Sequence, residues 1–165
     1  MRTGIILLVF VVALLTGLPA QVGASDSHAV LQREIKDLRE SALSLRGFVA
    51  TQMNTNSGSG RSESYRFQYA YYDELALWCG FLFYISNDVY AAREGGGIAG
   101  PDGCIAETQL ERQFRTRKMV RQYTAEDLRN MSFLNTIERE TIGRLDGRVA
   151  RIELDILLSI RALQR

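Results

Sequence analysis

The chain has 165 residues, of which 46 % are hydrophobic and 24 % are charged, so it is long enough to fold around one core. Its 20 basic and 19 acidic residues nearly balance, which argues against a nucleic-acid-binding protein, because such proteins carry a basic excess. Two cysteines and one histidine are too few for a structural zinc site, which needs four ligands.

The first 24 residues have the pattern of a secretory signal peptide. Arg2 supplies a positive start, residues 5–15 form an unbroken apolar run, and small residues stand at 22–24. An uncleaved anchor is the alternative, but a spanning helix needs about 20 apolar residues. Cleavage leaves one domain, residues 25–165. We therefore expect a periplasmic or secreted protein with no membrane span after signal cleavage.

Residues 27–53 predict an amphipathic helix. Its apolar side chains recur at alternating steps of four and three, which places them on one stripe of a helix. The members of this stripe are Leu31, Ile35, Leu38, Ala42, Leu45, Val49 and Met53. The polar linker 54–60 follows and is short enough to join two antiparallel helices.

Residues 62–93 predict a second helix that is unusually rich in aromatic side chains. Tyr65, Phe67 and Tyr69 alternate with other residues, which by itself would suit a strand. The four-three spacing continues much further, however, and only a helix satisfies it. The residues with this spacing are Phe67, Tyr71, Leu75, Trp78, Leu82, Ile85 and Val89. We take Gly80 as the weak point of this helix.

This second helix carries more aromatic rings than one buried face can hold. Surplus tyrosines on a surface usually mark a binding partner, because they offer large rigid contact area with a polar tip. We therefore predict Tyr69, Tyr72 and Tyr84 as partner-binding residues.

The glycine-rich loop 94–103 lacks any phosphate-binding fingerprint. In an exported protein, Cys79 and Cys104 are expected to pair, since oxidising compartments favour disulfides. The loop would bring Cys104 back along the second helix. We therefore predict one disulfide, which stabilises the fold by about 3–4 kcal/mol in the chain-entropy model.

The pattern of residues 105–122 predicts a third helix, and its cations are spread over more than half of the helix circumference. These cations are Arg112, Arg115, Arg117, Lys118 and Arg121. We interpret them as a solvated face, because nearby carboxylates balance them. The alternative is a basic contact face for a phosphate or an acidic partner.

Residues 124–127 resemble a capping box, so a further helix is expected to start there. The end of the chain then shows a clear four-three stripe, with Ser159 as its one polar member. The apolar members are Ile142, Leu145, Val149, Ile152, Ile156 and Leu163. Asn130 begins a glycosylation sequon, which has meaning only in a eukaryotic secretory pathway.

Three long apolar stripes must pack on one another. We therefore predict an all-α protein: an antiparallel bundle of about four helices with one disulfide. The alternative is a longer coiled-coil homodimer, in which the first and last helices pair between two chains.

The sequence contains no catalytic motif, and we predict no catalytic residue, no metal and no cofactor. Asp73 and Glu74 are adjacent carboxylates, but neighbouring helix positions point about 100° apart and do not flank one bond. His28 stands near a helix end, where we expect it to be solvated.

We expect a protein that binds another envelope or extracellular protein, as an inhibitor, immunity protein or assembly factor. The alternatives are a small-molecule-binding protein or enzyme with a site between helices, and a structural homodimer.

Overall fold

The computed structural model describes residues 24–55, 60–95, 104–123 and 131–163, and within these ranges it contains helices and no strand. The helices are α2 (Ala24–Thr55), α3 (Ser62–Arg93), α4 (Cys104–Met119) and α6 (Thr136–Ala162). The all-α class is therefore confirmed. The proposed signal peptide lies outside the described residues, except for its last position.

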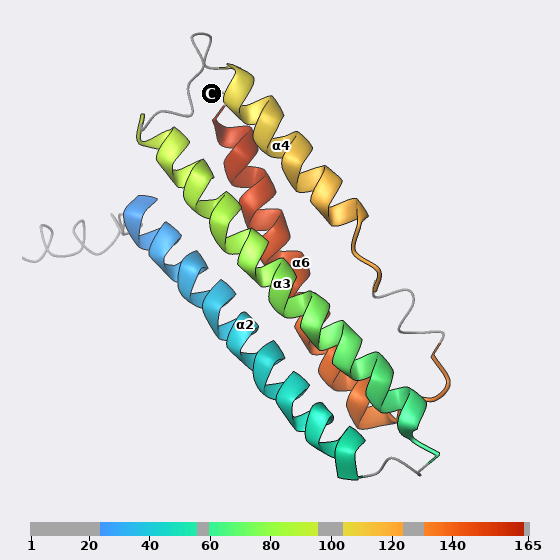
Figure 1. Cartoon of the computed structure of the whole chain (residues 1–165). Coiled ribbons are helices and arrows are strands. Elements are labelled where there is room, and N and C mark those ends of the chain that lie inside the picture. Colours follow the sequence, from blue (N-terminus) through green and yellow to red (C-terminus); the bar gives the residue numbers. More distant parts are fainter. Residues whose placement is uncertain (1–23, 56–59, 96–103, 124–130, 164–165) are drawn as a thin grey trace, which may run out of the picture.

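The helices form a bundle in which successive members run in opposite directions (Figure 1). The middle pair, α3 and α6, run parallel and contact each other, while α2 and α4 flank them. In the described part of the chain, α2 and α4 do not touch each other. One side of α3 is consequently left uncovered by any described helix.

The three predicted stripes form the core of this bundle. Every predicted stripe position of α3 is buried, and Leu75 and Leu82 are completely inaccessible. Burying one such side chain contributes about 1.5–3 kcal/mol. The stripes of α2 and α6 pack inside the same chain, chiefly through Leu38, Val49 and Ile152. A homodimer would therefore need a surface other than these two stripes.

Helix α4 is shorter than the other three described helices. Where α4 ends, non-helical residues between α4 and α6 cover the core. Tyr123 and Phe133 place their rings 5.0 Å and 5.8 Å from the Phe67 ring, both edge-on. Leu134 is also buried beside them. These three side chains thus cover the part of the core that the shorter α4 does not reach.

The last described helix, α6, begins at Thr136. The predicted start at residues 124–127 lies outside the described residues, and 131–135 are not helical. Instead, Asn135 caps α6 with a reciprocal capping box: its side chain accepts from the Glu138 amide at 2.9 Å, and its own amide donates to the Glu138 carboxylate at 2.8 Å. This arrangement satisfies two amides that a helix start leaves without partners.

The predicted disulfide is not found. Cys79 is buried and has no disulfide partner among the described side chains, which do not include that of Cys104. Its neighbour Trp78 packs against Phe114, which lies ten residues beyond Cys104 in α4. Ten helical residues span about 15 Å, whereas bonded cysteines need Cα atoms within about 7 Å.

Among the described helices, only α3 is long and apolar enough to cross a membrane by composition. The central helix of a bundle has the same composition, and 44 % of this apolar window is buried inside the protein. The packing of α3 therefore accounts for much of its apolar character, and its uncovered side accounts for the rest.

Candidate functional site

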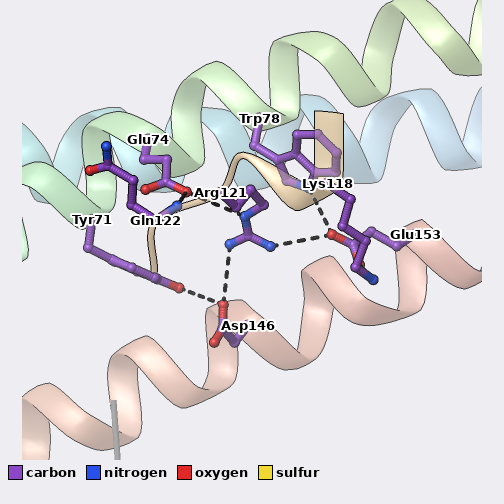
Figure 2. A network of polar contacts seen from close by, with 8 residues as sticks. All are labelled: Tyr71, Glu74, Trp78, Lys118, Arg121, Gln122, Asp146 and Glu153. Atoms are coloured by element: carbon purple, nitrogen blue, oxygen red, sulfur yellow. Dashed lines mark hydrogen bonds and ion pairs between the residues drawn. The ribbon is translucent and has the colours of Figure 1, made fainter. Parts of the chain in front are cut away.

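A cluster of charged side chains surrounds Arg121, just beyond the end of α4 (Figure 2). The Arg121 side chain is 12 % exposed. Its Nη1 lies 3.3 Å from Oε1 of Glu153. Its Nη2 lies 3.7 Å from Oδ1 of Asp146, and its Nε lies 3.7 Å from Oε1 of Glu74. One cation thus joins carboxylates of α3 and α6.

Further donors complete this arrangement. Trp78 donates from its indole to Oε1 of Glu153 at 2.8 Å, and the Lys118 ammonium lies 2.5 Å from the other oxygen. The Tyr71 hydroxyl donates to Asp146 at 3.0 Å. The Arg121 guanidinium also lies 5.7 Å from the centre of the Trp78 ring, within cation–π range. We call these side chains, together with Glu74, the Arg121 network.

Burial controls the protonation of this network. It raises the pKa of Asp146, and the Tyr71 and Arg121 contacts only partly oppose that rise. Burial also raises the pKa of Glu74, against the hydrogen bond from the Gln122 amide. The pKa of Tyr71 is raised as well, by burial and then by the charge of Asp146. Tyr71 therefore stays a neutral donor at physiological pH.

The Arg121 network is suited to holding the chain in place rather than to catalysis. Arg121 itself occupies the space between the carboxylates, so a substrate has no room there. In the described part of the chain, no group of three His, Cys, Asp or Glu residues is placed to hold a metal ion. The network fastens the end of α4 to α3 and α6.

The cations of the third helix do not form one solvated face. Arg121 is buried, Lys118 pairs with Glu153, and Arg115 pairs with Glu111 on its own helix at 2.6 Å. The four cations on the helix itself are all exposed, and Arg112 and Arg117 form no ion pair with another described residue. Periodicity could not reveal this division, because Arg121 follows the helix and its partners stand far away in the chain.

The three predicted partner-binding tyrosines do not form one surface. Tyr84 is 71 % exposed and Tyr69 is 37 % exposed, but Tyr72 is only 2 % exposed. The Tyr72 ring packs edge-on against Tyr71 at 5.5 Å, within the core. Tyr72 is therefore not available to a partner. Tyr69 and Tyr84 are fifteen residues apart, or about 22 Å along the helix.

A different set of side chains gathers around Tyr84. Leu77 is also 71 % exposed, and Phe81 between them is half-buried. Their spacing of four and three residues places all three on one line along the uncovered side of α3. We call Leu77, Phe81 and Tyr84 the α3 face. Sequence reasoning missed Leu77, although the uncharged run 75–87 extends around more of the helix than a buried face requires.

Basic side chains border the α3 face on both sides. From α2, the Lys36 ammonium lies 5.2 Å from the ring centre of Phe83, next to Tyr84. From α4, Arg112 and Arg117 line a shallow pocket of about 440 Å³ together with Phe81. The aromatic surplus and the cations, which the sequence analysis treated separately, therefore meet on one side of the bundle.

A separate pocket of about 330 Å³ lies among α2, α3 and α6. His28 stacks on Tyr90 with ring centres 4.3 Å apart, and its Nε2 lies 3.2 Å from the Asn87 side-chain oxygen. Arg93 and Asp155 also line this pocket. His28 is thus held in a ring stack, whereas its place near a helix end predicts a solvated side chain.

Two arrangements remain as candidates for binding: the α3 face with its basic border, and the pocket beside His28. Comparisons with protein-family models, with curated proteins and with solved structures found no match. The function is therefore argued from the geometry of these two arrangements.

Proposed function

We propose that this chain is a non-catalytic binding protein that holds a partner protein against the α3 face. The observation that carries this proposal is the exposure of Leu77 and Tyr84, 71 % each, on one line of a helix. Single exposed apolar residues are normal on protein surfaces. Apolar and aromatic residues aligned on an uncovered helix are typical of interfaces.

The pattern of residues 1–24 supports a place outside the cytoplasm for this activity. The partner is then another envelope or extracellular protein. The predicted roles of inhibitor, immunity protein or assembly factor all need such an interface and no catalytic group.

A capture experiment with matched variants tests the proposal. The tagged wild-type chain, a Leu77→Ser/Tyr84→Ser variant and an Ile137→Ser/Leu154→Ser variant are each incubated with envelope extract. Ile137 and Leu154 are also exposed, at 73 % and 53 %, but they belong to α6. We expect a stoichiometric partner with the wild type and the α6 variant, and its loss with the α3 variant. All three chains should give the same helical circular dichroism.

Retention of the partner by the α3 variant would contradict the proposal, as would its loss from the α6 variant alone. A partner that dissociates from both variants would identify a general effect of reduced surface hydrophobicity, which also contradicts a specific α3 interface.

A second candidate function is small-molecule binding in the pocket beside His28. The observation that favours it is that Arg93 and Asp155 line one pocket while neither forms an ion pair with another described residue. Leu31 and Ile156 supply an apolar wall. Such a lining suits a small apolar molecule that carries both an ammonium and a carboxylate.

Thermal shift with three related probes tests this second candidate. L-Leucine has both charges, isoamylamine has only the ammonium, and 4-methylpentanoate has only the carboxylate. We expect L-leucine alone to raise the melting temperature, and Asp155→Asn to remove the shift. Equal responses to all three probes, or none at millimolar concentration, would exclude this reading.

A further inference from the structure

We infer that the α3 face receives an acidic amphipathic helix of the partner, lying between α2 and α4. This inference rests on the proposed function and specifies the chemistry of the partner. Its basis is the combination of an apolar line with unpaired cations along both of its sides.

The shape of the surface favours a single helix as the occupant. The flanking helices α2 and α4 do not touch each other in the described chain, and they lie on either side of α3 (Figure 1). Exposed Leu77, half-buried Phe81 and exposed Tyr84 follow helical spacing over two turns. An amphipathic helix presents anchors with the same spacing to a groove of this kind.

The charges at the sides of the α3 face specify an acidic partner. Exposed Lys36 and Arg39 stand on α2, and exposed Arg112 and Arg117 stand on α4. Lys36 lies over Phe83, the Arg39 charge acts on the pKa of Cys79 in α3, and both arginines of α4 share a pocket with Phe81. None of these four cations forms an ion pair with another described residue. Carboxylates on a partner would supply the missing charges.

Two carboxylates mark the ends of the apolar line on α3 and limit the length of the contact with the partner helix. Asp73 stands four residues before Leu77, and Asp88 stands four residues after Tyr84. Asp73 is already paired with Arg46 of α2. Asp73 and Asp88 are fifteen helical steps apart, which is about 22 Å, so the partner contact extends over about four turns. Beyond it, the carboxylate of Asp88 would repel further acidic residues.

An anionic bilayer is the other occupant that an apolar and basic surface suits. Exposed carboxylates argue against it here: Asp37 and Glu40 stand on α2 next to the basic residues, and Asp88 stands at the end of the α3 face. A broad anionic surface would approach all three. A single helix between α2 and α4 avoids them.

The test uses two designed peptides with identical leucine positions. One peptide has glutamate along both sides of its leucine stripe, and the other has lysine at the same places. Fluorescence anisotropy measures their binding to the purified full chain. We expect the acidic peptide to bind at least tenfold more tightly, and its affinity to fall when NaCl is raised from about 50 to 500 mM, because salt screens surface charges.

Charge-reversal variants locate the site. Arg112→Glu/Arg117→Glu should lower the affinity for the acidic peptide at least tenfold. Arg144→Glu/Arg151→Glu should change that affinity less than twofold. The second pair carries the same change of charge but stands exposed on α6. Equal loss with both pairs would reduce the effect to net charge and overturn the inference.

The outcomes separate this inference from the proposed function. If Leu77→Ser/Tyr84→Ser releases the natural partner but both peptides bind alike, the α3 interface stands and the acidic helix is wrong. If vesicles containing about 30 % phosphatidylglycerol bind the chain and neither peptide does, the occupant is a membrane and the inference is also wrong. If the natural partner binds the Leu77→Ser/Tyr84→Ser variant as tightly as it binds the wild type, the proposed function itself fails.

Discussion

The two sides of this bundle are held together by different forces. On one side, α2 and α3 join along a continuous apolar seam with Leu38 and Leu75 inside it. On the other side, the end of α4 is fastened by one buried arginine among three carboxylates. The apolar seam tolerates small shifts of any single contact, because it is built from many contacts. In the Arg121 network, a single cation, Arg121, joins all three carboxylates, and Lys118 contacts only Glu153.

This difference has consequences for stability. Removing one partner of a buried ion pair leaves an uncompensated charge, which costs more than the pair itself contributed. Removing one apolar side chain from a long seam costs the transfer free energy plus the cavity left behind. Loss of the Arg121 cation should therefore destabilise the chain more than loss of one apolar side chain.

Arg121→Ala should have the largest effect, lowering the free energy of unfolding by about 3–5 kcal/mol, as expected when a buried ion pair loses one partner. It leaves Glu74, Asp146 and Glu153 close together without their shared cation. Urea unfolding at pH 7 measures the loss. Arg144→Ala, an exposed arginine on α6, is the control and should change stability by less than about 0.5 kcal/mol.

The loss caused by Arg121→Ala should also depend on pH. Burial raises the pKa of Asp146 and of Glu74, so these carboxyls bind protons more tightly in the folded state than in the unfolded state. Their ionisation therefore lowers stability as the pH rises through the raised pKa values, and protonation restores it as the pH falls. The variant should lose less relative to wild type at pH 5 than at pH 7. An equal loss at both values would show that these carboxyls do not carry the effect.

Leu75→Ala tests the apolar seam and should cost about 3 kcal/mol, within the range for buried leucines. Leu75 is completely buried, whereas Leu77, two residues later, is 71 % exposed. Leu77→Ala is the matched control and should leave the free energy of unfolding, measured with urea, within about 0.5 kcal/mol of wild type. A comparable loss in both variants would mean that the α3 face belongs to the fold rather than to a binding surface.

Asn135→Ala should lower stability by about 1 kcal/mol, because it removes the side-chain half of the capping box at the start of α6. Asn135→Asp keeps an acceptor at the cap and should stay close to wild type. Thermal unfolding of the three chains measures the difference. Equal melting temperatures would indicate that the start of α6 is held by packing alone.

Cys79 is the residue at which we expect the smallest change of stability on reduction, because no described side chain forms a disulfide with it. It is fully buried, and burial raises its pKa to about 12, so its thiol should not react with a disulfide reagent in the folded chain. Dithiothreitol should leave the melting temperature unchanged. In denaturant without reductant, we expect two reactive thiols. Finding none would restore the pairing of Cys79 with Cys104.

Three of the four described helices and their buried sides follow from local sequence patterns. The four-three stripes identified the buried side of α2, α3 and α6, because a helix that keeps this spacing must bury that side. The first two helices also begin and end within a few residues of the predicted positions. Periodicity is a local property, so one sequence is sufficient to read it.

Which charges and rings are buried depends instead on how the helices pack. The short separation along the chain suggested that Tyr69, Tyr72 and Tyr84 act together, but the position of α2 and α6 around α3 covers Tyr72 and leaves Leu77 open. Arg121 meets carboxylates that stand 25 to 47 residues away along the chain. No spacing rule connects residues so far apart, because their contact arises from the packing of whole helices.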